Sequence, residues 1–181
     1  MNSVAHAAHV REATPADAGA IARLYTESWQ SAYRGVLLEN YLENDALRER
    51  IATWQERFSK NFPKPMFALI AELDGEMAGF VCVFTEENPV YGSLLDNLHV
   101  APWFTGQGIG RKLLSAAAQR LVVEGSRAGL YLWVIEQNER ALHFYEKAGA
   151  QVVGTSPISM PDGQRLPAAR CYWPEPASLV T

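Results

Sequence analysis

The chain has 181 residues, 48% of them hydrophobic, and a formal net charge of −4 at pH 7. This length and composition predict a single globular domain over residues 1–181, with a core of its own and a loose tail over residues 1–8. The mild acidity and the absence of a Lys/Arg block argue against a nucleic-acid-binding protein, which would carry a basic face. Because no run of about 18 apolar residues and no signal-peptide pattern occurs, we expect no membrane span and a cytoplasmic protein.

The two cysteines, Cys82 and Cys171, both lie inside apolar runs. They lack the C-x-x-C spacing and the matching histidine pair of a metal site. We therefore expect two buried free thiols, neither a disulfide nor a metal ligand. No metal is expected in the functional site.

The first third of the chain predicts a short strand and two helices. The strand is expected over residues 10–12. The first helix begins with Thr14 as N-cap, Pro15 at the first helical position and Asp17 at the third, and helical spacing of apolar residues continues to about Tyr33. Four apolar side chains on one face then predict a second helix. They are Leu47, Ile51, Trp54 and Phe58.

The remainder of the chain alternates between strands and helices. Apolar runs at residues 66–72 and 77–84, joined by Asp74-Gly75, indicate a β-hairpin. The later predicted elements are a strand at 94–100, a helix to about 121, a strand at 130–135, a helix at 138–148 and an antiparallel pair near 152–153 and 169–173.

This order of elements predicts an α/β (α+β) fold with a mixed sheet and helices on both faces. The strand at 94–100, the helix after it and the strand at 130–135 form one β-α-β unit, whose two strands should be parallel. The carboxyl end of the first of these strands is a place where α/β sheets commonly bind ligands.

A glycine-rich turn stands at that position. Three glycines alternate at 106, 108 and 110, directly before a helix. If each adopts a positive φ, successive backbone N–H groups form a concave anion-binding nest, and the helix N-terminus adds its dipole. The spacing is not the G-x-G-x-x-G of dinucleotide folds, and Gly110 is followed by Arg111, not by the Lys-Ser/Thr pair of a nucleoside triphosphate loop. A phosphate or pyrophosphate of another kind of ligand is expected there.

Two segments together resemble a known family. Residues 98–110, Leu-His-Val-Ala-Pro-Trp-Phe-Thr-Gly-Gln-Gly-Ile-Gly, resemble the Gln/Arg-x-x-Gly-x-Gly/Ala pyrophosphate loop of the GNAT superfamily of acetyl-CoA-dependent N-acetyltransferases. Residues 138–149, Asn-Glu-Arg-Ala-Leu-His-Phe-Tyr-Glu-Lys-Ala-Gly, resemble its Asn-x-x-Ala-x-x-Phe-Tyr-Glu-x-x-Gly helix. The likeness covers about residues 9–173. It departs from the family at Thr105, where Gln or Arg is usual.

The resemblance implies a mostly antiparallel sheet of six to seven strands that splays between its two central parallel strands. Acetyl-CoA would enter this gap as a cosubstrate, with its pantetheine arm paired to the backbone of Leu98, His99 and Val100. Asn138 and Tyr145 would contact it from the later helix. The pyrophosphate would bind the turn formed by Thr105, Gly106, Gln107, Gly108, Ile109, Gly110 and Arg111.

The resemblance also implies roles in the chemistry. The amide of Val100 would stabilise the oxyanion that forms when an amine attacks the thioester. Tyr145 would protonate the leaving thiolate, because a phenol with a pKa near 10 is a suitable donor to a thiol with a pKa near 8.5. On periodicity alone, Tyr145 is a packed helix residue. Asn138 is explained equally by N-capping.

A general base is needed for an amine that is protonated at pH 7. Asp96 and His99 on the strand at 94–100, and Glu72 on a neighbouring strand, are the candidates, with ordered water as an alternative. Strand alternation places Asp96 on the same side as Leu98 and Val100, unless a bulge interrupts the strand. Asp96 is the preferred base.

The acceptor is expected against the first helix, at Trp29 and Tyr33, and a small-molecule primary amine is the expected substrate. Three nearby acids, Glu39, Glu43 and Asp45, favour a cationic amine or form a solvated face. The alternatives are a protein N-terminal or lysine acetyltransferase, a non-catalytic acyl-CoA-binding regulatory domain, and a nucleotide-binding protein of another fold. The last hairpin could pair across a homodimer.

Overall fold

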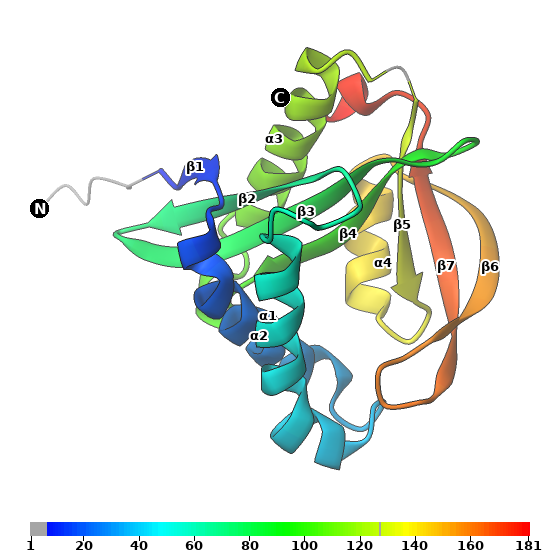
Figure 1. Ribbon diagram of the computed structural model, residues 1–181. Coiled ribbons are helices and arrows are strands. Elements are labelled where there is room, and N and C mark those ends of the chain that lie inside the picture. Colours follow the sequence, from blue (N-terminus) through cyan, green and yellow to red (C-terminus); the bar gives the residue numbers. More distant parts are fainter. Residues whose placement is uncertain (1–6, 127) are drawn as a thin grey trace, which may run out of the picture.

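The computed structural model describes residues 7–126 and 128–181. Seven strands form one sheet in the order β1-β2-β3-β4-β5-β7-β6 (Figure 1). Neighbouring strands are antiparallel, except that β4 and β5 are parallel. This confirms the mixed, mostly antiparallel sheet. The strands are β1 (His9–Glu12), β2 (Met66–Leu73), β3 (Glu76–Asn88), β4 (Gly92–Val100), β5 (Leu130–Ile135), β6 (Gln151–Ser159) and β7 (Arg165–Trp173).

Helices cover both faces of the sheet, as predicted (Figure 1). On one face, α1 (Ala18–Tyr33) and α2 (Ala46–Arg57) pack Ile21 and Trp54 against Phe80 of β3. On the other face, α3 (Ile109–Val123) and α4 (Glu139–Lys147) close a second core, in which Leu113 and Tyr145 lie among side chains from β2 to β5 and from β7. The sheet is therefore the middle layer of three, and both layers of helices reach β4.

The start of the first helix agrees with its sequence signals. Thr14 is the N-cap, as predicted, and it forms a capping box with Asp17, whose carboxylate accepts a hydrogen bond from the Thr14 backbone N–H at 2.8 Å. Pro15–Asp17 form a 3₁₀ turn (η1), so the α-helix itself begins at Ala18. Asp17 also pairs with Arg11 of β1 at 2.8 Å, which ties the helix start to the edge of the sheet.

Several details differ from the sequence predictions. A π-helical turn, η2 (Tyr41–Asp45), precedes α2, and short 3₁₀ turns, η3 (Pro102–Phe104) and η4 (Pro176–Leu179), follow β4 and β7. In α2, Trp54 is fully buried, but Leu47 is 39% exposed. Leu47 is therefore not part of the apolar face predicted for this helix, because η2 covers the core at that end through Tyr41 and Leu42.

The strands β4 and β5 separate soon after they begin. Their register contains two pairs, Ser93 with Leu130 and Leu94 with Tyr131. Beyond these pairs the two central strands diverge, and the carboxyl-terminal half of β4 keeps β3 as its sheet partner. The splay expected from the family resemblance is therefore present at the predicted pair of strands.

A β-bulge at Asp96 interrupts β4 and overturns the alternation predicted for this strand. Val83 of β3 pairs with Leu95, whereas the next residue back, Cys82, pairs with Asn97, so Asp96 is an extra residue. Asp96 consequently faces α2, while Leu98 packs into the core on the opposite face. Such a bulge shifts every later side chain relative to simple counting.

Both cysteines are free and buried, as predicted. Within the described ranges, no helix is long and apolar enough to span a membrane. β6 is the outermost strand beside β7 (Figure 1). Nearly all residues of β6 are exposed. Pairing of this hairpin across a homodimer stays a prediction.

Candidate active site

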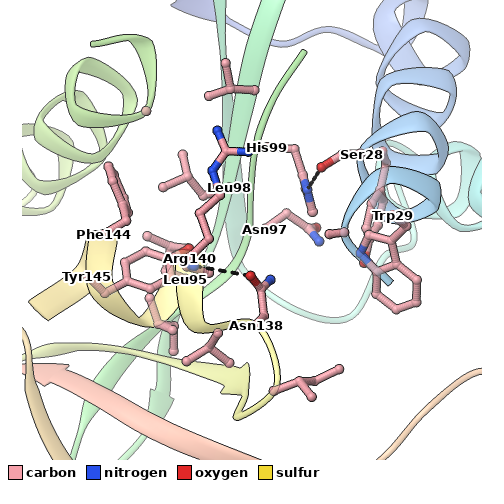
Figure 2. A pocket seen from close by; sticks show the side chains of 18 of the residues that line it. Ser28, Trp29, Leu95, Asn97, Leu98, His99, Asn138, Arg140, Phe144 and Tyr145 are labelled. Atoms are coloured by element: carbon pink, nitrogen blue, oxygen red, sulfur yellow. Dashed lines mark hydrogen bonds between the residues drawn. The ribbon is translucent and has the colours of Figure 1, made fainter. Parts of the chain in front are cut away.

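A cavity of about 1490 Å³ occupies the region where β4 and β5 diverge. Its lining comes from both faces of β4: Trp29 and Ser28 of α1 lie on one side, and Phe144 and Tyr145 of α4 lie on the other (Figure 2). The turn after β4 closes one end. A ligand in this cavity can therefore reach the glycine turn, the free edge of β4 and the first helix at the same time.

The glycine turn has the predicted geometry at two of its three glycines. Gly106 and Gly108 have φ values of 82° and 76°, and a Cβ at either position would meet nothing within 4 Å. Backbone conformation, not crowding, is therefore the reason for glycine at both. Gly110 differs from the prediction: it lies inside α3 and has no positive φ. A Cβ there would lie 3.4 Å from the Phe144 ring.

The turn presents unpaired donors at the N-terminus of α3. Gly108 is the N-cap, and no side chain caps the helix. The first i→i−4 bond runs from the Lys112 N–H to the Gly108 carbonyl, at 3.0 Å. The amides of Ile109, Gly110 and Arg111 precede it, and they carry the positive end of the helix dipole. This arrangement suits a phosphate group.

The side chain of Thr105, the residue that departs from the family pattern, forms a hydrogen bond within the turn. Its hydroxyl donates to the carbonyl of Pro102 at 2.9 Å. The hydroxyl proton therefore stabilises the turn, and the Gln107 side chain beside it is exposed. The donors that the turn itself offers to an anion are therefore its backbone amides.

The free edge of β4 directs one amide into the gap. The Ala101 N–H donates to the Ala78 carbonyl of β3 at 2.9 Å. Because successive N–H groups along a strand point in opposite directions, the Val100 N–H points away from β3, toward the space left by β5. The Leu98 N–H shares this direction. Of the three backbone positions predicted from the resemblance, Leu98 and Val100 therefore direct N–H donors into the gap, whereas the N–H of His99 points toward β3; all three residues line the cavity.

Tyr145 is 8% exposed and packs edge-to-face on Phe144 and Trp173, with ring centroids 5.2 and 6.0 Å away. Burial raises the pKa of its phenol well above the ordinary value, and the neighbouring Tyr33 and Cys171 raise it further. The group is therefore fully protonated at neutral pH. It lines the cavity from the α4 side (Figure 2).

Asn138 is the N-cap of α4, as predicted: its Oδ1 accepts from the Ala141 N–H at 3.2 Å. Its Nδ2 donates to the hydroxyl of Tyr33 at 3.2 Å. Tyr33 in turn packs edge-to-face on Trp29, at 5.1 Å between centroids. The two aromatic residues expected at the acceptor site thus border the cavity and are connected to α4.

His99 faces α1, where its Nδ1 is 2.9 Å from the hydroxyl of Ser28 (Figure 2). Its ring lies 4.5 Å from that of Tyr25, centroid to centroid. Burial lowers the pKa of His99 to about 3, with a further contribution from the positive charge of Arg50. The imidazole is therefore neutral at pH 7 and a poor proton acceptor for an ammonium group.

The two candidate carboxylates have different surroundings. Asp96 lines the cavity, and its Oδ2 accepts from Nη2 of Arg57 at 2.7 Å. The same guanidinium donates to Oδ1 of Asn97 at 2.8 Å. Glu72 instead pairs with Arg11 at 2.8 Å, away from the cavity lining. Of the two, Asp96 alone is placed at the site.

The three acids proposed to favour a cationic amine are not at the cavity. Glu39 and Glu43 both pair with Arg34, at 2.9 and 2.7 Å, and Asp45 pairs with Arg48 at 2.8 Å. None of the three lines the cavity. They form the solvated face that was the alternative explanation, because each has a basic partner close by in the chain.

Three residues that line the cavity on the α1–α2 side were not predicted from the sequence. Tyr25 and Asn97 lie within apolar periodic segments, and Arg50 stands beside the apolar face of α2. Their approach depends on how α1 and α2 pack on the sheet, which local periodicity does not encode. The other wall residues include Ile158 and Met160 from the β6–β7 hairpin.

Comparison with known proteins identifies the family. The family "Acetyltransferase (GNAT) family" matches residues 20–150. Similar proteins are the N-acetyltransferase YuaI of Bacillus subtilis (27% identity, over 95% of this chain and 96% of the relative) and an N-acetyltransferase of Archaeoglobus fulgidus (34%, over 75% and 88%). The L-amino acid N-acyltransferase MnaT of Escherichia coli is 29% identical, over 82% of each chain.

A solved structure shares the fold. The PaiA N-acetyltransferase of Thermoplasma acidophilum, determined in complex with coenzyme A, superposes with a TM-score of 0.73 at 23% identity, over 92% of this chain and 99% of that one. The family match, the relatives of nearly full length and this shared fold agree with the splayed sheet and its glycine turn. The chain belongs to the GNAT family of acetyltransferases.

Proposed function

We propose that this protein transfers the acetyl group of acetyl-CoA directly to the primary amine of a small molecule. The observation that carries the proposal is the single cavity in which the glycine turn, the outward amide of Val100 and the buried phenol of Tyr145 meet. A domain that only binds an acyl-CoA needs the glycine turn. An acyl-transfer enzyme needs the turn, the Val100 amide and the Tyr145 phenol together.

The turn and the free edge of β4 suit the two ends of the cosubstrate. The unpaired amides from Ile109 to Arg111 would hold the pyrophosphate, with Gly106, Gln107 and Gly108 forming the wall around it. The pantetheine arm would extend β4 by pairing with Leu98 and Val100, because these amides lack a strand partner in the gap. Asn138 would border the arm from α4.

The chemistry would then follow from two donors. As the amine nitrogen bonds to the thioester carbon, the carbonyl oxygen gains negative charge, and the Val100 N–H donates to it. Removal of one such donor costs about 10²–10³ in rate in other acyl-transfer enzymes. When the carbon–sulfur bond breaks, Tyr145 gives its proton to the departing thiolate. Because burial raises the pKa of Tyr145, the phenol is protonated throughout the neutral range, and the same shift makes it a weaker acid than an ordinary phenol.

Asp96 would accept the proton that the attacking ammonium loses. Its Oδ2 is held by Arg57, while its Oδ1 has no partner among the described residues. The bulge puts this carboxylate on the α1–α2 side of β4, which is also the side of Trp29. Asp96 lies four residues before Val100 on β4, too far along the strand for its carboxylate to reach an amine at the Val100 amide directly. Proton transfer would therefore pass through ordered water.

The names of relatives support a small-molecule acceptor. MnaT acts on L-amino acids, and the spermidine N(1)-acetyltransferase of Escherichia coli, which is 32% identical over 47% of this chain, acts on spermidine. A peptidyl-lysine N-acetyltransferase, YiaC of Escherichia coli, is 30% identical over 57% of the chain. A protein acceptor is therefore the second candidate.

Two measurements test the proposal in sequence. Calorimetric titration with acetyl-CoA, CoA and ATP should show binding of both CoA species and none of ATP. Thiol release is then followed with polyamines, amino acids and a lysine peptide. Release that depends on one class of small amine supports the proposal. Release with the lysine peptide alone would favour the second candidate, and CoA binding without release under any amine would favour a regulatory domain.

A further inference from the structure

Arg50 lines the cavity on the α1–α2 side and has no counter-ion among the described residues. The guanidinium carbon of Arg50 in α2 lies 4.3 Å from the ring centroid of Tyr25 and 4.4 Å from that of Trp29. Its Nη2 is buried and has no hydrogen-bond partner in the part of the chain that the structure describes. Arg34 and Arg57, in contrast, each hold a carboxylate within 2.9 Å. Within residues 7–126 and 128–181, Arg50 pairs with no acid.

Such an arrangement is costly unless a ligand completes it. A buried donor without an acceptor loses its hydration and receives nothing in exchange, and the loss is larger for a charged group. The guanidinium lies over both rings, and these two cation–π contacts hold it in place without using the Nη2 donors. The edge of a fixed guanidinium matches a carboxylate, which it can bind through two parallel hydrogen bonds.

Arg50 is also close to the reacting end of β4. Tyr25 contacts both the Arg50 guanidinium and the ring of His99, and the charge of Arg50 contributes to the lowered pKa of His99. His99 directly precedes Val100, whose amide points into the gap. A compact acceptor can therefore have one end at Arg50 and the other near that amide. The acid that lines this side, Asp96, is already paired with Arg57.

We propose that Arg50 determines acceptor specificity by binding a carboxylate of the acceptor, so that the substrate is a small molecule that carries both a primary amine and a carboxylate, as α-amino acids do. This inference rests on the proposed function. A guanidinium can also bind a phosphate or phosphonate through two parallel hydrogen bonds. An aminophosphonate therefore serves as a comparison ligand in the test.

The test compares matched acceptors and matched variants. Amino acids and their carboxamides, which differ in the anionic group alone, are assayed by thiol release with acetyl-CoA. The wild type should prefer the acids by about 10- to 100-fold in kcat/KM, the range expected for a hydrogen-bonded charge pair. Arg50→Met should remove this preference through KM and leave the carboxamides unchanged. Arg50→Lys keeps the positive charge but cannot form two parallel hydrogen bonds to a carboxylate. Its preference for the acids should lie between those of the wild type and Arg50→Met. Arg48→Met, at an exposed position on the same helix, is the control.

Acceptor binding separates this inference from the proposed function. The acid and carboxamide pair is titrated by calorimetry into the enzyme saturated with CoA. Arg50-dependent binding of the acid without thiol release would overturn the proposed function and leave the carboxylate site standing. Thiol release with equal use of acids and carboxamides, with preference for the aminophosphonate, or with the preference intact in Arg50→Met would overturn this inference alone. If Arg50→Met fails to fold, the wild-type comparison and Arg50→Lys decide.

Discussion

The side-chain amide of Asn138 donates to the hydroxyl of Tyr33 at 3.2 Å and thereby joins the start of α4 to the end of α1 across the cavity. These two helices lie on opposite faces of the sheet, and β4 and β5 no longer pair at this level. The bond therefore spans the splay that the cosubstrate and the acceptor would enter from opposite sides. A substitution of either residue should therefore change the affinity for both the cosubstrate and the acceptor.

Replacement of Asn138 should separate its two roles. Asn138→Ala removes the N-cap and the bond to Tyr33, and should lower the free energy of unfolding by about 1–2 kcal/mol. Asn138→Ser keeps a capping oxygen and loses the amide donor, so its loss should be smaller. Tyr33→Phe should match the serine variant. Urea unfolding measures all three, and additive losses in the Asn138→Ser/Tyr33→Phe double variant would argue against a direct bond.

Tyr145→Phe should reduce kcat by about 10²–10⁴, the usual contribution of a positioned general acid. The phenyl ring keeps the packing on Trp173, so the melting temperature and the affinity for acetyl-CoA should not change. Since burial raises the pKa of Tyr145, its ionisation should not limit wild-type activity between pH 6 and 9. Full turnover in Tyr145→Phe would remove the residue from the mechanism.

The two kinds of glycine in the turn should respond differently to alanine. Gly108→Ala forces a Cβ into a left-handed conformation at a cost of about 1–2 kcal/mol, and the distorted amides should weaken acetyl-CoA binding by about 10-fold or more. Gly110→Ala has no such strain, because Gly110 lies in α3 with ordinary helical geometry. Calorimetry should find the larger loss of affinity in Gly108→Ala. The reverse order would contradict the assignment of the anion nest.

Asp96→Asn should lower kcat/KM by about 10²-fold, at the lower end of what positioned bases contribute. A structural role would reduce stability because Arg57 loses its partner, but it would not change the pH profile. Loss of a general base would change the pH profile. Activity of the variant should then recover as the pH rises toward the pKa of the amine, because the acceptor is already deprotonated there. An unchanged profile with reduced stability would assign Asp96 a structural role and leave water as the proton acceptor.

The ion pair at the start of α1 predicts a loss of stability in acid. The hydrogen bond from Arg11 lowers the pKa of Asp17 below its ordinary value of 3.8. The contribution of Asp17 is therefore complete above pH 3.8 and is lost as the pH falls below it. Asp17→Asn should lower the melting temperature at pH 7 by about 2–4 °C, the shift for about 1 kcal/mol in a domain of this size. The variant and the wild type should converge in acid.

The sequence was most informative where chemistry depends on the backbone. The β-α-β unit, its glycine turn and the N-cap at Thr14 were predictable, because glycine, proline and capping residues act on their immediate neighbours. The bulge at Asp96 was not, since one extra residue in a strand leaves the local composition unchanged. The sequence also does not predict that Arg50 lacks an acidic partner among the described residues. This feature depends on how α2 packs beside α1.

The most direct test of the central claim is a stoichiometric one. Purified protein is incubated with acetyl-CoA and one primary amine, and free thiol and N-acetylated amine are quantified together, the product by mass spectrometry. We expect one acetylated amine for each thiol released, with both signals reduced in parallel in Tyr145→Phe. Thiol release without acetylated amine would contradict direct acetyl transfer in the cavity between β4 and β5, whereas yields in Tyr145→Phe as high as in the wild type would contradict the role of Tyr145 alone.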